Sequence, residues 1–301
     1  MHDHRTWPLA HGRAIALDRV RIVGILNITP DSFSDGGELA SVGLAVDAAR
    51  RMLREGADML DIGGESTRPG AARVHADEQL RRVLPVIRAV REACGDDALM
   101  SIDTTLAPVA APAIEAGAHA INDVSACTDD ADMLPLAART GAGLILMHRL
   151  APPSADSYST HYAAAPAYPG GVVACVREFL TQRIAAALAA GVRRESLVLD
   201  PGLGFGKSVE QNLELIARTS ELAALGLPIL SGLSRKSFTA VAAGLPRETP
   251  PRDRLAPTLA LSLAHLHAGA SLFRVHDVAE HAVALLRPGA QPQTNPRPSA
   301  A

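Results

Sequence analysis

Leu199-Asp200-Pro201-Gly202-Leu203-Gly204-Phe205-Gly206-Lys207-Ser208 is the stretch around which the rest of this chain is arranged. The apolar run from Leu197 to Leu199 predicts a short buried strand that ends on the Asp200 carboxylate. Three alternate glycines follow, and glycine lets a backbone take positive φ and come close to a ligand. A phosphate-binding P-loop is excluded because Pro201 stands where that motif requires glycine. The alternative is a glycine-rich turn that only closes a strand, so the other strand ends decide between the two.

Short apolar runs recur along the chain, and several follow a glycine placed just after a helical pattern, where a left-handed C-cap residue is favoured. The clearest of these glycines are Gly56, Gly117, Gly141 and Gly269. Eight strands are predicted, near residues 22, 59, 99, 120, 144, 197, 229 and 272. Continuous apolar runs are typical of parallel strands covered on both faces. Eight strand–helix units over about 265 residues favour an α/β (β/α)8 TIM barrel, and an open doubly wound sheet is the alternative.

Composition sets the boundaries and excludes several classes of protein. Residues 1–20 are predicted as a lead-in segment, residues 21–286 as one barrel domain, and the Pro-rich residues 287–301 as a disordered tail. A net charge of −3 argues against nucleic-acid binding, which needs a basic face. Apolar runs long enough to cross a membrane and a signal-peptide core are both missing from the sequence. Three widely spaced cysteines predict reduced thiols in a cytoplasmic protein.

Lysine is rare in this chain. Of 29 basic residues only Lys207 and Lys236 are lysines, and both follow apolar strands in loops rich in glycine or serine. An ammonium is a compact point charge, whereas a guanidinium is a planar fork. The two lysines are therefore expected where the ammonium group itself matters.

Polar residues stand at the ends of all eight predicted strands, where a barrel of this type builds its active site. Any one of the aspartates alone could be a helix N-cap. Eight polar strand ends that converge on one mouth instead predict a functional site. The polar residues at these ends include Asn27, Asp61, Asp103, Asn122, Asp123, His148, Asp200, Lys236, Arg274 and His276.

These residues separate into two chemical halves. The first half offers several hydrogen-bond donor and acceptor groups and suits a flat heterocycle, since ionised acceptors strengthen such bonds. Its members are Asp103, Asn122, Asp200 and Lys236. The second half offers anion contacts and suits a diphosphate. Its members are Ser66, Thr67, Arg68, Arg235, Arg274 and His276, and the Asn27 amide oxygen could hold Mg²⁺ beside them.

The motifs resemble dihydropteroate synthase over residues 21 to 286. They are GILNITPDSFSDGG (24–37), GGESTRPGA (63–71), SIDT (101–104), NDVS (122–125), LMH (146–148), DPGLGFGK (200–207), SRKSF (234–238) and RVHDV (274–278). The resemblance implies a (β/α)8 barrel, usually dimeric. Such an enzyme joins 6-hydroxymethyl-7,8-dihydropterin diphosphate to p-aminobenzoate in folate biosynthesis, with Mg²⁺, by SN1-like loss of diphosphate.

The resemblance also implies a role for each matching residue, with Mg²⁺ placed at Asn27. The implied catalytic residues are Lys236, Asp103, Arg68 and Thr67. The pterin-binding residues are Asp103, Asn122, Met147, Asp200 and Lys236. The diphosphate-binding residues are Asn27, Thr67, Arg68, Arg274 and His276. The p-aminobenzoate pocket comprises Phe33, Pro69, Gly204, Phe205, Lys236 and Ser237. Two loops, which carry Asp31–Asp35 and Thr67–Pro69, are expected to close over the reaction.

The chain departs from the family pattern after His148, where residues 149–171 form a segment rich in Tyr, Ser and Pro. We expect a longer surface loop that alters the rim and not the chemistry, so that shortening it leaves turnover intact.

Two other functions stay open. One is a pterin-binding barrel that transfers methyl groups from a folate to a corrinoid, which would leave Arg68, Phe205 and Lys236 unexplained. The other is a pterin-binding protein without turnover.

Overall fold

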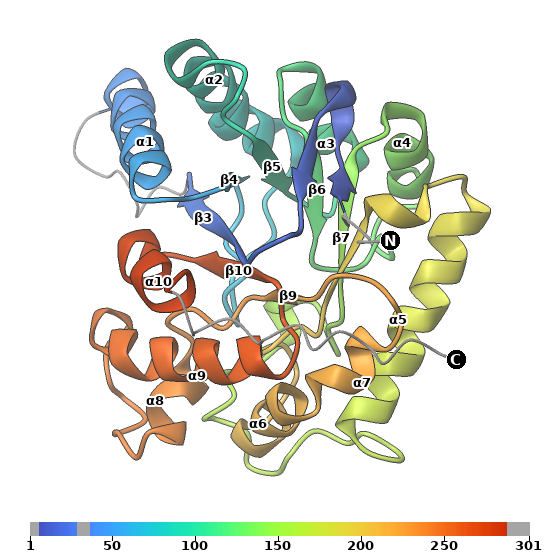
Figure 1. Ribbon diagram of the computed structural model, residues 1–301, viewed down its shortest axis with the longest axis vertical. Coiled ribbons are helices and arrows are strands. Elements are labelled where there is room, and N and C mark those ends of the chain that lie inside the picture. Colours follow the sequence, from blue (N-terminus) through green and yellow to red (C-terminus); the bar gives the residue numbers. More distant parts are fainter. Residues whose placement is uncertain (1–5, 29–36, 288–301) are drawn as a thin grey trace, which may run out of the picture.

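The computed structural model describes residues 6–28 and 37–287, in which eight parallel strands form a barrel (Figure 1). The strands are β3 (Arg21–Asn27), β4 (Met59–Gly63), β5 (Met100–Asp103), β6 (Ala120–Asp123), β7 (Gly143–Met147), β8 (Leu197–Asp200), β9 (Leu230–Ser231) and β10 (Leu272–Val275). Their order in the sheet is β8-β7-β6-β5-β4-β3-β10-β9. A parallel bridge between Leu199 and Ile229 joins the two ends. The predicted TIM barrel is confirmed, and this closure excludes the open doubly wound sheet.

Helices surround the barrel and cover the outer face of its strands (Figure 1). They are α1 (Gly37–Arg54), α2 (Ala76–Cys94), α3 (Ala107–Glu115), α4 (Met133–Thr140), α5 (Val172–Ala189), α6 (Val209–Ala217), α7 (Thr219–Ala223), α8 (Ser237–Ala242), α9 (Leu255–His267) and α10 (Val278–Leu285). Every residue of β4 and of β7 is buried, as their continuous apolar runs predict. The four glycines predicted as C-caps, at 56, 117, 141 and 269, all have positive φ. Local sequence therefore marks where these four helices end.

The segment predicted as a lead-in has a structure of its own. Within it β1 (Thr6–Pro8) and β2 (Ala14–Ala16) form an antiparallel hairpin. Trp7 is completely buried, and its Nε1 donates to the carbonyl of Ser196 at 2.8 Å. Position 143 next to Trp7 has room for glycine alone, because a Cβ on Gly143 would lie 2.8 Å from Trp7 Cε2 and 2.6 Å from Leu9 Cδ2.

The hairpin closes one end of the barrel. Trp7, Leu9 and Ile15 belong to an apolar cluster that takes one residue from each of seven strands, which identifies it as the barrel interior. The strand residues are Val23, Met59, Ala120, Ile145, Val198, Leu230 and Leu272. These residues precede the polar strand ends along their strands. The mouth therefore lies at the opposite, carboxyl end of the strands.

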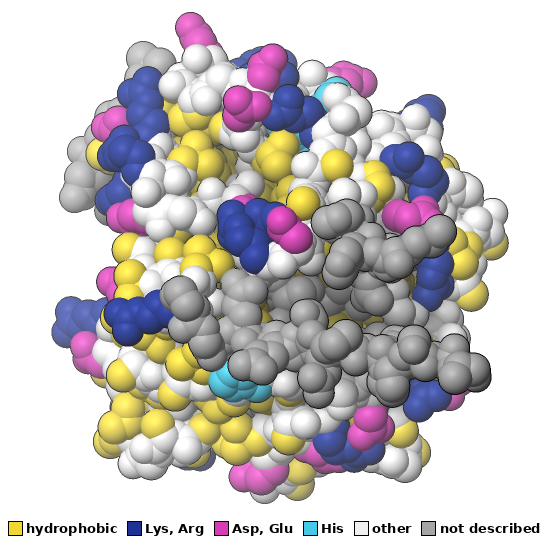
Figure 2. All heavy atoms as spheres, in the orientation of Figure 1, with side chains coloured by type: hydrophobic (Ala, Val, Ile, Leu, Met, Phe, Trp, Pro, Cys, Tyr) yellow, Lys and Arg dark blue, Asp and Glu magenta, His cyan; other side chains and the backbone are white. Residues whose placement is uncertain are grey.

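Two predicted features lie on residues that the structure does not describe. The loop with Asp31, Phe33 and Asp35, and the tail from residue 288 onward, lie outside the described residues. In the part of the chain that is described, none of the helices combines the length and apolar character that a membrane span requires. The three cysteines are free thiols, and Cys127 is buried. Figure 2 shows acidic and basic side chains interspersed on one face of the molecule.

Candidate active site at the carboxyl ends of the strands

Strand register brings the first half of the predicted site together. Asp103 on β5 pairs directly with Asn122 on β6, and Asp103 also pairs with Gly63 at the end of β4. Met147 on β7 pairs with Asp200 on β8. All four side-chain-bearing residues of these pairs are at most 4% exposed. The predicted pterin residues therefore lie at one buried edge of the barrel.

An ion-pair network crosses the mouth from β10 to β4 and β5. Arg274 Nε donates to Asp61 Oδ2 at 2.5 Å, and Arg274 Nη2 donates to Asp103 Oδ2 at 2.7 Å. Asp61 also accepts from Asn122 Nδ2 at 3.0 Å and from Ser101 Oγ at 2.6 Å. The guanidinium predicted to bind diphosphate is thus already matched by two carboxylates.

Asp61 was predicted to end its strand at the mouth but received no binding role of its own. It lies in the middle of the apolar strand β4 and is completely buried. A carboxylate inside a strand that is apolar on both sides needs partners, because an unpaired buried charge is costly. The sequence marked Asp61 as a polar strand end, but it could not name Arg274 and Asn122 as the partners of its carboxylate.

Burial dominates the electrostatics of the mouth. Desolvation raises the pKa of Asp103 to about 7, although the neighbouring Arg274 favours the carboxylate. Desolvation also raises the pKa of Asp200, against the opposing charge of Lys236. Desolvation lowers the pKa of His276 to about 3, and Arg274 and Arg235 add to this effect. His276 is therefore neutral near pH 7, with its Nδ1 3.1 Å from Ser234 Oγ.

Buried histidines predict loss of stability in acid. Desolvation lowers the pKa of His265, completely buried against Phe273, to about 3. Its pKa in the unfolded chain is about 6.5, so its contribution to stability is complete above pH 6.5 and is lost as the pH falls toward 3. We expect His265→Gln to reduce the fall in unfolding free energy between pH 6 and pH 5 by about 1.4 kcal/mol per pH unit. Urea unfolding at several pH values measures this slope, and equal slopes for the two proteins would contradict the assignment.

Lys236 lies against the glycine-rich loop that follows β8. Its Nζ donates to the carbonyl of Leu203 and lies 4.1 Å from the centroid of the Phe205 ring. Gly204 makes room for it, since a Cβ at that position would lie 2.7 Å from Lys236 Cδ. The ammonium is enclosed although the residue is partly exposed, and desolvation lowers its pKa to about 8. The Asp200 Oδ1 accepts from the Gly202 N–H at 2.7 Å.

A small apolar patch faces this polar set. Val124, Met147 and Phe205 form a cluster of their own, separate from the two larger cores. Met147 and Phe205 were predicted as site residues from the sequence. Val124 was not, because a valine after a strand is typical of an ordinary hydrophobic core. Three apolar side chains beside Asp103, Asn122 and Asp200 suit a flat ring with polar edges.

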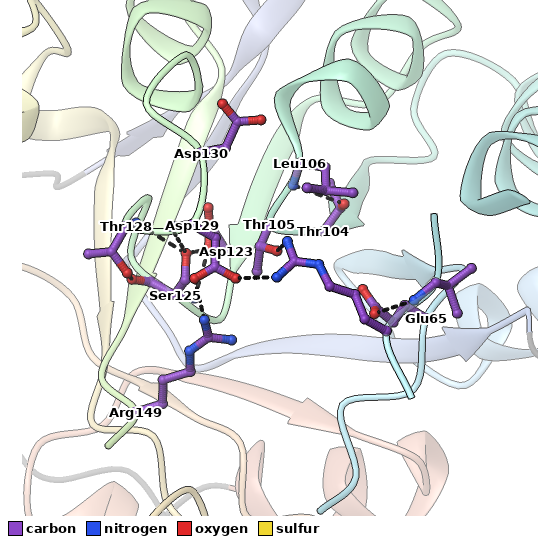
Figure 3. A network of polar contacts seen from close by, with 12 residues as sticks. Glu65, Thr104, Thr105, Leu106, Asp123, Ser125, Thr128, Asp129, Asp130 and Arg149 are labelled. Atoms are coloured by element: carbon purple, nitrogen blue, oxygen red, sulfur yellow. Dashed lines mark hydrogen bonds and ion pairs between the residues drawn. The ribbon is translucent and has the colours of Figure 1, made fainter. Parts of the chain in front are cut away.

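The β4–α2 loop forms one wall of a pocket beside the mouth. Thr67 and Pro69 are half-buried and Arg68 is exposed. The pocket is lined by residues that include Thr67, Asp103 and Val124. Glu65 ties the ends of the loop together, because its carboxylate accepts from the Val74 N–H at 2.8 Å (Figure 3). Closure of this loop over a substrate stays a prediction.

A network of charges borders the same pocket on its other side. Asp129 accepts from Arg149, which follows β7, and from Arg73 of the β4–α2 loop at 3.2 Å (Figure 3). The Gly70 N–H donates to the Pro153 carbonyl at 2.8 Å. The β4–α2 loop is therefore fastened to the segment that follows β7.

The remaining predicted residues lie around the rim. Asn27 is half-buried at the end of β3, opposite Gly63. Ser237 is buried and begins α8. Arg235 pairs with Asp277, with Nε 2.9 Å from Oδ2, so its guanidinium is already engaged. Among the described residues no group of three or more His, Cys, Asp and Glu side chains suits a metal ion.

The chain is similar in sequence to known proteins over most of its length. A family model described as "Pterin binding enzyme" matches residues 23–276. The chain is 42% identical over 260 residues to a dihydropteroate synthase of Synechocystis sp., covering 86% of each protein. It is 44% identical over 268 residues to a probable bifunctional folylpolyglutamate synthase/dihydropteroate synthase of Haloferax volcanii, covering 89% of this chain and 30% of that protein.

Solved structures of Xanthomonas albilineans dihydropteroate synthase are also similar. The complex with 4-aminobenzoic acid superposes with a TM-score of 0.82 at 43% identity, covering 93% of this chain and 97% of the other. The complex with 7,8-dihydropteroate has a TM-score of 0.78 at 40% identity over the same shares of the two chains.

Proposed function

This chain belongs to the pterin-binding enzyme family, and from that premise we propose that it is a dihydropteroate synthase. The reaction joins 6-hydroxymethyl-7,8-dihydropterin diphosphate to p-aminobenzoate and releases diphosphate and 7,8-dihydropteroate. The observation that carries the proposal is the buried set of Asp103, Asn122 and Asp200 beside the apolar patch of Val124, Met147 and Phe205.

The pterin is assigned to this buried set. Asp200 accepts two N–H groups from the amino-pyrimidinone edge, and an ionised acceptor makes such bonds strong. Asn122, whose amide is oriented by Asp61, offers both a donor and an acceptor. Met147 packs on the ring, and the Lys236 ammonium supplies a donor at the other side. Asp103 completes the set.

The diphosphate is assigned to the rim above it. Asn27, Thr67, Arg68, Arg274 and His276 are the proposed contacts. Arg274 is already paired with Asp61 and Asp103. Much of the positive charge that faces the negatively charged leaving group would therefore come from Arg68. A neutral His276 would serve as a hydrogen-bond donor rather than as a cation.

A Mg²⁺ ion is proposed at Asn27. The donors present suit an ion that arrives with the substrate, because Mg²⁺ keeps several waters and is commonly bound through one or two protein oxygens plus phosphate. The half-buried Asn27 amide supplies one such oxygen at the strand end. When bound, the ion would neutralise charge on the departing diphosphate.

The p-aminobenzoate is assigned to Phe33, Pro69, Gly204, Phe205, Lys236 and Ser237. The face of the Phe205 ring can pack against the aromatic ring of p-aminobenzoate. The enclosed Lys236 ammonium, which lies over the Phe205 ring, can serve as the counter-charge of the p-aminobenzoate carboxylate. In the reaction, the C–O bond to diphosphate breaks first and the leaving group takes the electron pair. The pterin-stabilised cation is then attacked by the arylamine nitrogen, which afterwards loses a proton.

The assay that tests the proposal combines pterin diphosphate, Mg²⁺ and p-aminobenzoate, and follows diphosphate release and 7,8-dihydropteroate together. Stoichiometric formation of both is the expected result. Methyl transfer from methyltetrahydrofolate to a corrinoid, without dihydropteroate, would identify the other pterin-dependent activity. Tight pterin binding without any product would identify a non-catalytic protein.

We also propose that the protein is a cytoplasmic homodimer. The free cysteines suit a reducing compartment. Light scattering should give about twice the chain mass of 31.4 kDa, whereas a mass near 31.4 kDa would contradict the dimer.

A further inference from the structure

The segment that departs from the family pattern, residues 149–171, covers the glycine-rich loop of residues 201–208. Two of its side chains bind the backbone of one residue in that loop. The Gly206 N–H donates to Asp156 Oδ2 at 2.9 Å, and the Tyr168 hydroxyl donates to the Gly206 carbonyl at 2.7 Å. Leu150 packs so closely that a Cβ on Gly206 would lie 2.3 Å from its Cβ. Both polar groups of the Gly206 backbone are thus fixed by residues 149–171.

Lys207 ties the same loop together from below. It is completely buried, and its Nζ donates to the carbonyls of Gly202 at 2.9 Å and Phe205 at 2.8 Å. The Lys207 Nζ also lies 3.0 Å from His148 Nδ1, and the centroid of the His148 ring lies 6.0 Å from that of the Tyr168 ring. These three contacts agree with the expectation that Lys207 is kept for its ammonium group, which carries three N–H donors.

The held loop carries Phe205 between two glycines of positive φ, Gly204 and Gly206. Glycines allow many backbone conformations, so a loop of this composition needs external contacts to keep one of them. The Phe205 ring faces Lys236, which in turn donates to Leu203 of the same loop. Fixing Gly206 therefore fixes the wall against which p-aminobenzoate is proposed to bind.

Residues 149–171 are themselves anchored on both sides. Asn212 of α6 donates from Nδ2 to Ser159 Oγ at 3.0 Å, and Gln211 donates from Nε2 to the Pro166 carbonyl at 2.7 Å. On the other side the Pro153 carbonyl accepts from Gly70. These contacts show that the segment holds the loop that carries Phe205, whereas the expectation that it leaves turnover intact stays a prediction.

We propose that Asp156 and Tyr168 are positioning residues for p-aminobenzoate, which act through the backbone of Gly206. This inference rests on the proposed synthase function. It assigns the segment a part in selecting the second substrate and leaves the pterin half of the site independent of it.

The test uses Tyr168→Phe and Asp156→Asn, which remove a donor or an acceptor with little change of shape. The KM for p-aminobenzoate should rise up to about tenfold in each, the effect of one lost hydrogen bond. The kcat and the KM for pterin diphosphate should stay within about twofold. Tyr158→Phe, which alters a tyrosine of the same segment that is 38% exposed, is the matched control and should change none of these values.

Calorimetric binding of p-aminobenzoate, with pterin and diphosphate present, separates this inference from the function on which it rests. Weaker binding by both variants supports the inference even if wild-type turnover were absent. Equal binding by the wild type and Tyr168→Phe would overturn it, as would a parallel loss of affinity for pterin. A wild type that binds no p-aminobenzoate would overturn both proposals. Thermal melting identifies any variant that fails to fold, and Tyr168→Phe, the smaller change, then decides.

Discussion

Lys236→Ala is expected to lower kcat/KM by about 10²- to 10³-fold, the usual effect of removing one well-placed electrostatic contact. The ammonium lies over the Phe205 ring, donates to the Leu203 carbonyl and opposes the buried Asp200 carboxylate. Its loss would remove contacts to both proposed substrates at once. Steady-state measurement of diphosphate release, with each substrate varied in turn, gives the value.

Two further variants define this result. Lys236→Arg should also be impaired, because the planar guanidinium cannot follow the path that the ammonium takes past Gly204. Arg177→Ala, on the exposed face of α5, is the control for loss of a positive charge and should retain wild-type activity. Activity of Lys236→Ala within threefold of wild type would remove this residue from the proposed site.

Asp61→Asn is expected to lower the free energy of unfolding by about 3 kcal/mol, because breaking a buried ion pair leaves a charge uncompensated. Asp61 is 0% exposed and accepts from Arg274, Asn122 and Ser101. The asparagine keeps the shape but presents an N–H group where one of these donors now points. Urea unfolding, analysed by linear extrapolation, measures the change.

Asp97→Asn is the matched control for that measurement. Its side chain is 96% exposed and pairs with Arg13 at 2.5 Å, so the loss should stay below about 1 kcal/mol. The Asp61 variant should also lose affinity for pterin, since the Asn122 amide and Arg274 lose their common acceptor. Equal stability losses for the two variants would show that the network at the mouth contributes little.

Much of the candidate site could be predicted from the sequence because the polar strand ends are local features. Asp103, Asn122 and Asp200 each end an apolar run, and a parallel barrel brings such ends to one rim whatever the details of packing. Val124 was missed, and Asp61 was given no role, for a different reason. Valine is ordinary in a core, and the importance of Asp61 depends on partners that the strand itself does not reveal.

Local patterns along the chain are enough to predict the eight strands, the four glycines that end helices, and most of the polar residues at the mouth. Each of these follows from the order of apolar, glycine and polar residues within about ten positions. How those residues pair becomes visible only in the folded barrel. Closure of the barrel sets Arg274 between Asp61 and Asp103, and the packing of residues 149–171 brings Asp156 and Tyr168 to Gly206. It also turns the lead-in segment into a hairpin whose Trp7 seals the far end. Such pairings join distant parts of the chain, and they depend on register and closure, which no local pattern encodes.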